Sequence, residues 1–253
     1  MIIDAPTRAQ LPRLRRIWQE AFGDSDEFWN TFQNTAFSLN RCRCATVEGE
    51  VAAALYWFDC SHADRRIAYL YAIATANAYR GHGLCHRLMD DTHEHLKSLG
   101  YTGALLVPAS QSLFNFYQSM GYRTCAHVDR FTCAAAESGI TLRAIDRTEY
   151  AKLRRKLLPP EGVIQENENL EFLQTMADFY TGNGFLLAAR QENATLLGIE
   201  LLGDRSVAPR LVRALGCQSG SFQAPGGKHP FAMYCPLDGG KAPAPGYFGF
   251  AFD

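Results

Sequence analysis

Hydrophobic positions in the first half of the chain recur at strand spacing in some stretches and at helix spacing in others. Short apolar runs between turn residues predict strands, whereas apolar residues three and four positions apart predict amphipathic helices. The predicted strands are Ile2–Ile3, Cys42–Val47, Val51–Asp59, Arg66–Thr75, Ala104–Val107 and Cys125–Ala134. The first predicted helix begins at Thr7 and contains the apolar residues Leu11, Leu14, Trp18 and Phe22. The other predicted helices cover Glu27–Phe37, Leu84–Leu99 and Ser112–Met120. The first half is therefore expected to be an α/β domain with a mixed sheet.

Turn residues support this arrangement. Glu48-Gly49-Glu50 separates two predicted strands and is typical of a hairpin turn. Together with the strand that follows, the hairpin predicts an antiparallel meander of three strands. Gly100 stands directly after the helix Leu84–Leu99, where a left-handed C-terminal cap belongs, so it marks the end of that helix.

A similar order of elements restarts after the small, flexible residues Ala135 to Gly139. It comprises a strand over Ile140–Ile145, a helix over Thr148–Leu158 stopped by Pro159-Pro160, a longer helix through Leu170, Leu173, Ala177 and Tyr180, and a hairpin over Phe185–Leu202 turning at Glu192-Asn193. The rest of the chain is expected to hold a helix from Asp204 to Leu215 and strands near Ser221, Met233 and Phe248. The repeated order suggests an internal duplication and two domains, 1–135 and 139–253.

Composition and charge exclude several classes of partner. The 253 residues are 47% hydrophobic and 20% charged, as in ordinary globular domains. Since 25 Lys and Arg oppose 26 Asp and Glu, the net charge of −1 supplies no general attraction to nucleic acid or to an anionic membrane. Asp4, Pro6 and Arg8 interrupt the N-terminal stretch, so no signal peptide is expected, and no apolar run is long enough to span a bilayer. We expect a cytoplasmic protein.

Cysteines and histidines give no pattern of metal ligands. The eight cysteines are irregularly spaced, which favours reduced thiols over a disulfide framework. Cys42-Arg43-Cys44 has no second pair downstream, so it lacks the four ligands of a structural zinc site. Solvation of a helix surface explains the four clustered histidines better than metal binding does; they are His82, His86, His93 and His95. No metal is therefore expected.

The segment Tyr79-Arg80-Gly81-His82-Gly83-Leu84-Cys85 follows a predicted strand and opens the helix Leu84–Leu99. Backbone amides at a helix N-terminus point out of such a turn, and the helix dipole favours negative charge there. Gly81 and Gly83 let the backbone approach a bulky anion with no Cβ in between. The segment predicts a cradle for a pyrophosphate, and the alternative is a turn without a ligand.

These residues resemble the R/Q-x-x-G-x-G/A signature of the GNAT N-acetyltransferases, with Cys85 where that family has Gly or Ala. The resemblance covers residues 1 to 135 and implies the GNAT fold, a mixed sheet that splays to admit acetyl-CoA as co-substrate. It further implies that the backbone of Ile73, Ala74 and Thr75 binds the pantetheine arm. The residues implied to hold the pyrophosphate are Arg80, Gly81, His82, Gly83, Leu84 and Cys85. The activity implied is transfer of an acetyl or short acyl group to a primary amine of a small molecule or peptide.

A second signature lies at the end of the predicted helix Ser112–Met120. Phe116-Tyr117-Gln118-Ser119-Met120-Gly121-Tyr122 resembles the family's Phe-Tyr-x-x-x-Gly-Tyr ending, whose tyrosine protonates the departing thiolate. That role falls here on Tyr117. The alternative is a core tyrosine with its hydroxyl at the surface. Ser110 stands seven residues earlier, where the family often has an asparagine that contacts the cofactor.

The resemblance leaves the general base open, because the strand Arg66–Thr75 lacks the glutamate that many relatives carry there. The candidates are Asp24, Asp26, Glu27, a water and the C-terminal carboxylate of Asp253. Cys85, near a helix N-terminus, is a candidate nucleophile, but a neighbouring pyrophosphate opposes its thiolate, and packing explains this residue better.

Residues from Phe22-Gly23-Asp24 through Pro108-Ala109-Ser110 resemble the acetyltransferases named for enhanced intracellular survival. That group adds a degenerate second GNAT-like domain, which the predicted duplication matches, and a third domain, for which this sequence has no counterpart. The second half shows no cofactor loop at Asp204–Leu211, so it is expected to border the acceptor site or to mediate a homodimer rather than to bind CoA. The alternatives are a non-catalytic CoA-binding sensor or partner-binding module, and a scaffold that binds no CoA.

Overall fold

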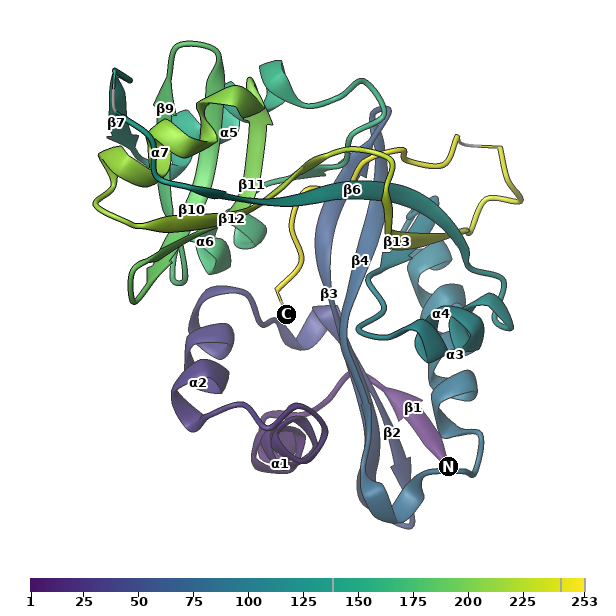
Figure 1. Ribbon diagram of the computed structural model, residues 1–253. Helices are drawn as coiled ribbons and strands as arrows, with labels where there is room; N and C mark the ends of the chain where they lie inside the picture. The colour runs from purple at the N-terminus through teal and green to yellow at the C-terminus, as the bar shows by residue number, and fades with distance from the viewer. Residues whose placement is uncertain (138, 242, 253) are drawn as a thin grey trace. The chain divides into compact units, whose positions relative to one another are not determined.

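The computed structural model describes residues 1–137, 139–241 and 243–252, and the chain forms two compact units (Figure 1). One unit comprises Met1–Arg123 with Met233–Pro243, and the other comprises Thr124–Ala232 with Ala244–Asp253. The predicted domain ranges, 1–135 and 139–253, divide the chain by sequence order, whereas these units divide it by compactness, so the ranges stay a prediction. Within the described ranges, no helix is both long and apolar enough to cross a membrane.

The first unit contains a mixed sheet with the strand order β1-β2-β3-β4-β5-β13. Its strands are β1 (Ile2–Asp4), β2 (Cys42–Val47), β3 (Glu50–His62), β4 (Arg65–Thr75), β5 (Gly103–Leu106) and the end of β13 (His229–Pro236). Neighbouring strands are antiparallel except β4 and β5, which are parallel. The mixed sheet and the β2-β3-β4 meander confirm the fold class expected from the sequence.

Helices cover both faces of this sheet. They are α1 (Leu11–Phe22), α2 (Asp26–Thr35), α3 (Leu84–Ser98) and α4 (Gln111–Gln118). Figure 1 shows α1 and α2 on one side of β3 and β4, and α3 and α4 on the other. Tyr56 of β3 packs against Trp18 and Trp29 under the first pair, with ring centroids 5.3 and 6.1 Å away. The next residue, Trp57, lies in the core cluster that includes Leu88 of α3. Both faces of β3 are therefore buried, which explains its continuous apolar run.

β4 leaves β5 part of the way along its length. The two strands pair over residues 67–69 and 103–105, and among the described residues β4 runs on to Thr75 without a β5 partner. A bulge interrupts the β3–β4 register just before this end. Ala72 within the bulge has a φ of +48°, a left-handed conformation that turns the strand. The parallel pair is therefore splayed at residues 73–75.

The sheet of the second unit repeats the strand order of the first, with the same parallel and antiparallel pairings. The order is β7-β9-β10-β11-β12-β6, with neighbours antiparallel except β11 and β12. The elements are β6 (Arg123–Ala134), β7 (Leu142–Ile145), α5 (Arg147–Leu157), β8 (Ile164–Gln165), α6 (Glu168–Leu173), β9 (Asp178–Gly182), β10 (Phe185–Glu192), β11 (Thr195–Gly203), α7 (Ala208–Ala214) and β12 (Ser219–Pro225). α5 and α6 precede β9 in sequence, as α1 and α2 precede β2. α7 connects the parallel strands β11 and β12, as α3 connects β4 and β5. This topology supports an internal duplication.

The long helix predicted in the second half is wrong. It was expected to pass through Leu170 and Tyr180, but α6 ends at Leu173 and Tyr180 lies in β9. Phe179 of β9 stacks on Tyr150 of α5 with ring centroids 4.2 Å apart. Tertiary packing therefore decides the conformation of this stretch against its helical spacing.

The strand predicted near Phe248 is also wrong, since residues 248–252 form no strand. Side chains hold this segment instead of a neighbouring strand. Gln165 donates a hydrogen bond to the Phe250 carbonyl at 2.8 Å, beside a buried ion pair in which Arg154 and Glu200 are 2.8 Å apart. The apolar spacing of the tail therefore reflects burial of its aromatic residues, not strand pairing.

Candidate active site

The loop that joins β4 to α3 begins with a short turn, η3 (Asn77–Tyr79), and ends at Gly83, the N-cap residue of α3. Gly81 and Gly83 have φ values of +80° and +71°. Glycine is favoured in this left-handed region because it has no Cβ. A Cβ added at either position would meet no atom within 4 Å, so the space beside both glycines is open to a ligand.

The N-terminus of α3 presents unpaired donors. In the part of the chain that the structure describes, the backbone N–H groups of Gly81, His82 and Gly83 have no acceptor, and no side chain caps the helix. The first turn of α3 contains no acidic residue that would oppose the positive end of the helix dipole. Open amides at the positive end of a helix are a suitable environment for a phosphate group.

The loop at 80–85 is hydrogen-bonded to the splayed end of β4. Arg80 joins them, because its Nε donates a hydrogen bond to the Thr75 carbonyl at 3.0 Å. Ala74 is buried, and Ile73 packs against the core cluster that contains Leu84, the first residue of α3. The residues expected to bind pantetheine and pyrophosphate therefore lie next to one another.

Glu20 of α1 also contacts this loop, although the sequence does not predict it. Its carboxylate accepts a hydrogen bond from the Asn77 amide at 2.6 Å, so α1 holds the first turn of the loop. The two residues are 57 positions apart, and Glu20 resembles any other exposed residue of an amphipathic helix. No local pattern distinguishes it, and only the tertiary contact shows its position.

α4 places Tyr117 beside the start of α3. Tyr117 is 7% exposed and shares a core cluster with Leu84, against which Ile73 and Cys85 also pack. The strand end, the loop and the second signature therefore pack against the same core cluster. Among the described residues the Tyr117 hydroxyl has no hydrogen-bond partner, so it is available to a ligand.

Burial sets the protonation states of Tyr117 and Cys85. It raises the pKa of Tyr117 well above that of free tyrosine, and the neighbouring Cys85 adds to the rise. At neutral pH the phenol keeps its proton, as a general acid requires. Burial also raises the pKa of Cys85 to about 11, so this thiol is neutral and poorly suited to act as a nucleophile.

Ser110 is the N-cap residue of α4. Its carbonyl accepts a hydrogen bond from the Leu113 amide at 3.0 Å, and its Oγ lies 2.9 Å from the Ser112 Oγ. Within the described ranges no hydrogen bond joins Ser110 to the loop at 80–85. Its contact with a cofactor stays a prediction.

The acidic candidates for the general base lie between α1 and α2. Asp24 accepts a hydrogen bond from the Trp18 indole at 2.7 Å, Asp26 is engaged by side chains of α1, and Glu27 is an exposed residue in the first turn of α2. Asp253 lies outside the described residues. Since Asp24 and Asp26 already have structural partners, the base stays unassigned.

One of the four clustered histidines is not at the surface. His93 of α3 is 8% exposed, and its Nε2 lies 2.7 Å from the Tyr122 hydroxyl. Surface solvation is therefore the wrong explanation for His93, which belongs to the core. In the described part of the chain no three His, Cys, Asp or Glu side chains are grouped to hold a metal ion.

Acid is expected to destabilise the protein through His93. Burial lowers the pKa of His93 to about 4, from an ordinary value of 6.5. As the pH falls, the unfolded chain takes up this proton first, so the stabilisation is complete above pH 6.5 and is lost between pH 6.5 and 4. By about pH 5 the free energy of unfolding should have fallen by about 2 kcal/mol through this group.

Urea unfolding at about pH 8 and about pH 5 measures this loss, with His93→Gln as the control. Glutamine keeps a hydrogen-bonding group near Tyr122 but does not titrate. Between these two pH values, the free energy of unfolding of the variant should therefore fall by about 2 kcal/mol less than that of the native protein. Equal losses in the two proteins would show that His93 is not responsible.

The segment that contains this site matches a family model. Residues 3–125 match the model of the acetyltransferase (GNAT) domain. A solved GCN5-related N-acetyltransferase from Kribbella flavida has a TM-score of 0.73 and 16% identity, over 94% of this chain and 71% of that chain. Eis1 from Mycobacterium abscessus has a TM-score of 0.70 and 13% identity, over 94% and 74%. At these identities the solved structures establish the fold alone.

No curated protein has a significant sequence match to this chain. The family model nevertheless covers the segment that contains both signatures, the loop at 80–85 and Tyr117. The solved structures extend the shared fold over most of the chain. Residues 3–125 therefore match a GNAT acetyltransferase domain, and most of the chain shares the fold of a solved GCN5-related N-acetyltransferase.

Proposed function

We propose that the protein transfers an acetyl or other short acyl group directly from acetyl-CoA to a primary amine. One observation carries this proposal: an uncapped helix N-terminus, a splayed strand end and a buried tyrosine adjoin the same core cluster. The open amides at 81–83 suit a pyrophosphate, the unpaired edge of β4 at 73–75 suits the amides of pantetheine, and Tyr117 suits the sulfur.

Each part of the site has a separate task in this reaction. The loop at 80–85 binds and orients the pyrophosphate, and the edge of β4 aligns the thioester arm. Bound acetyl-CoA supplies the activated acyl group. As the amine nitrogen bonds to the acyl carbon and the carbon–sulfur bond breaks, Tyr117 gives its proton to the sulfur. A water or carboxylate takes the proton that the amine loses.

The described residues of the second unit form no comparable cradle, so we propose that each chain binds one acetyl-CoA. The turn before α7 is occupied by its own side chain, because the Asp204 carboxylate accepts a hydrogen bond from the Ser206 amide at 2.9 Å. Pro209, in the first turn of α7, has no N–H to donate. The start of α7 therefore presents a negative charge, and it has fewer backbone N–H donors than the start of α3.

Calorimetric titration of acetyl-CoA tests the cofactor site. We expect micromolar binding with one site per chain. Release of CoA thiol in the presence of polyamines, amino acids, aminoglycosides and peptides then tests transfer and identifies the class of amine. Two binding sites per chain would contradict the assignment of the second unit.

A non-catalytic CoA-binding sensor is the second candidate. It is favoured by β4, which contains no acidic residue between Arg65 and Thr75 and so supplies no general base. Turnover separates the two proposals: a sensor binds acetyl-CoA but releases no thiol with any amine of the panel. If acetyl-CoA does not bind at all, both proposals fail and a scaffold role is left.

A further inference from the structure

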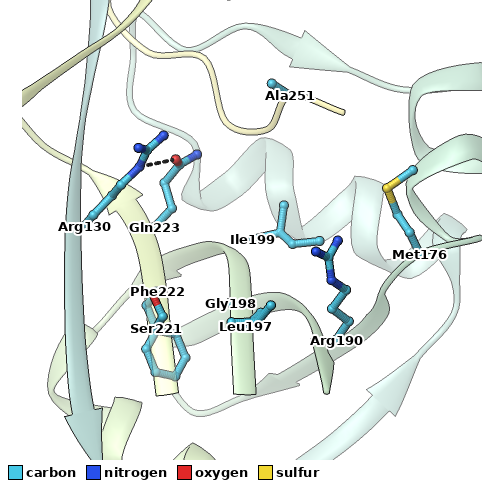
Figure 2. A pocket seen from close by; sticks show the side chains of 10 residues that line it. All are labelled: Arg130, Met176, Arg190, Leu197, Gly198, Ile199, Ser221, Phe222, Gln223 and Ala251. Carbon is cyan, nitrogen blue, oxygen red and sulfur yellow. Dashed lines mark hydrogen bonds between the residues drawn. The ribbon is translucent and has the colours of Figure 1, made fainter. Parts of the chain in front are cut away.

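The second unit contains a pocket of about 380 Å³ on its sheet (Figure 2). Residues of β6, β10, β11 and β12 line it, together with Met176 and Ala251. A volume of this size is within the range of small-molecule sites. The pocket takes no part in the transfer reaction proposed above, which uses residues of the first unit.

The pocket lies where β11 separates from β12. The two parallel strands pair over residues 195–198 and 219–222, and β11 then continues to Gly203. A bulge interrupts the β10–β11 register at the same point. β4 leaves β5 in the same way in the first unit. The second unit therefore keeps the splay of the fold, although its helix start is unsuited to a pyrophosphate.

Two guanidinium groups line this pocket. Arg190 of β10 extends toward Ile199, and Arg130 of β6 lies beside Gln223 at the other side (Figure 2). None of the ten described lining residues is acidic. Glu192 accepts a hydrogen bond from the Arg190 Nε at 2.8 Å, and among the described residues the two terminal nitrogens of Arg190 have no acceptor. The pocket therefore favours an anion.

The side of the pocket opposite Arg190 is held in place by hydrogen bonds. The Gln223 side chain accepts a hydrogen bond from the Arg130 Nε at 3.3 Å and donates one to the Gly249 carbonyl at 2.9 Å. Arg130 also lies over the Phe231 ring, 5.8 Å from its centroid. These contacts fix polar groups before any ligand arrives, which lowers the entropy lost on binding.

We propose that this pocket binds a small organic carboxylate with a short apolar body. The planar guanidinium of Arg190 offers parallel N–H donors that match a carboxylate. Leu197, Ile199 and Met176 supply apolar surface for the body of the ligand. Arg130 reinforces the positive charge of the site from the opposite side.

Hexanoate is a suitable probe, because it combines a carboxylate with a short chain. Backbone amide NMR signals of the full-length protein are followed during its titration at constant ionic strength. The signals of Gly198, Ser221 and Gln223 should shift and saturate in the millimolar range. Hexylamine, a cation with the same chain, should leave these signals in place. Absence of shifts with hexanoate, or equal binding of hexylamine, overturns the proposal.

Matched variants test the role of Arg190. Arg190→Gln should weaken hexanoate binding about tenfold or more, and Arg190→Lys should restore part of the loss. Arg213→Gln is the control, because Arg213 is an exposed residue of α7, which packs on the other face of the sheet. Thermal unfolding confirms that each variant is folded. Unchanged affinity in folded Arg190→Gln overturns the proposal, and none of these measurements depends on acetyl-CoA or on turnover.

Discussion

Replacing Gly83 with aspartate is expected to lower the affinity for acetyl-CoA about 100-fold or more. Aspartate tolerates the φ of +71° at this position better than most residues do, and its side chain enters space with no atom within 4 Å. The new carboxylate faces the pyrophosphate and competes for the same amides. Two like charges about 4 Å apart near a protein surface repel by about 4 kcal/mol. Calorimetric titration measures the loss directly.

Two variants separate charge from backbone strain in this experiment. Gly83→Asn has nearly the same size and backbone tolerance but no charge, so its affinity should fall less than about tenfold. Gly100→Asp places the same charge at the other end of α3, where φ is +82°, and should leave the affinity unchanged. Native affinity in Gly83→Asp would show that the loop is not the pyrophosphate cradle.

Replacing Tyr117 with phenylalanine is expected to lower kcat about 100-fold or more, with little change in the KM for acetyl-CoA. The ring keeps its place in the core cluster, and among the described residues its hydroxyl has no partner to lose. The variant therefore keeps its fold and its cofactor site but cannot protonate the departing sulfur. Thiol release, with the amine that the native protein acetylates fastest, measures the effect.

Tyr122→Phe is the control for this variant. Its hydroxyl lies 2.7 Å from the His93 Nε2, so removing it should lower the free energy of unfolding, by about 1 kcal/mol, but leave kcat unchanged. A variant Tyr117→Phe that keeps native kcat would mean that water or another group protonates the sulfur. A fall in kcat for both variants would point to altered packing around α3 and α4.

The glycine loop at 80–85 and the strands around it could be predicted because their determinants are local. Gly81 and Gly83 adopt the left-handed backbone that only glycine takes readily, and α3 begins directly after them. Tyr117 was identified from the resemblance of the segment Phe116 to Tyr122 to a family signature, which also spans only a few residues. Family resemblance added the roles of these residues, which geometry alone does not supply.

Other features escaped prediction because residues far apart in sequence decide them. The hydrogen bond from Asn77 to Glu20 and the burial of His93 against Tyr122 depend on packing between elements, and neither leaves a trace in a hydrophobic pattern. The stretch at 178–182 has helical spacing but pairs with β10 and β7. Burial in a sheet outweighs a weak local preference.

The sequence by itself determined most helices and strands of this protein, its mixed α/β class and the position of its glycine loop, because alternation, helical spacing and positive φ act over a few residues. Beyond the meander of β2, β3 and β4, tertiary structure decided which strands pair. β13, which follows β12 in sequence, pairs with β5 in the first unit, and β6, which follows β5 in sequence, pairs with β12 in the second. It also decided where β4 leaves β5 and where β11 leaves β12, and so where the two candidate sites lie. Strand partners and splay depend on which edges remain free once the helices have packed, and no local pattern carries that information.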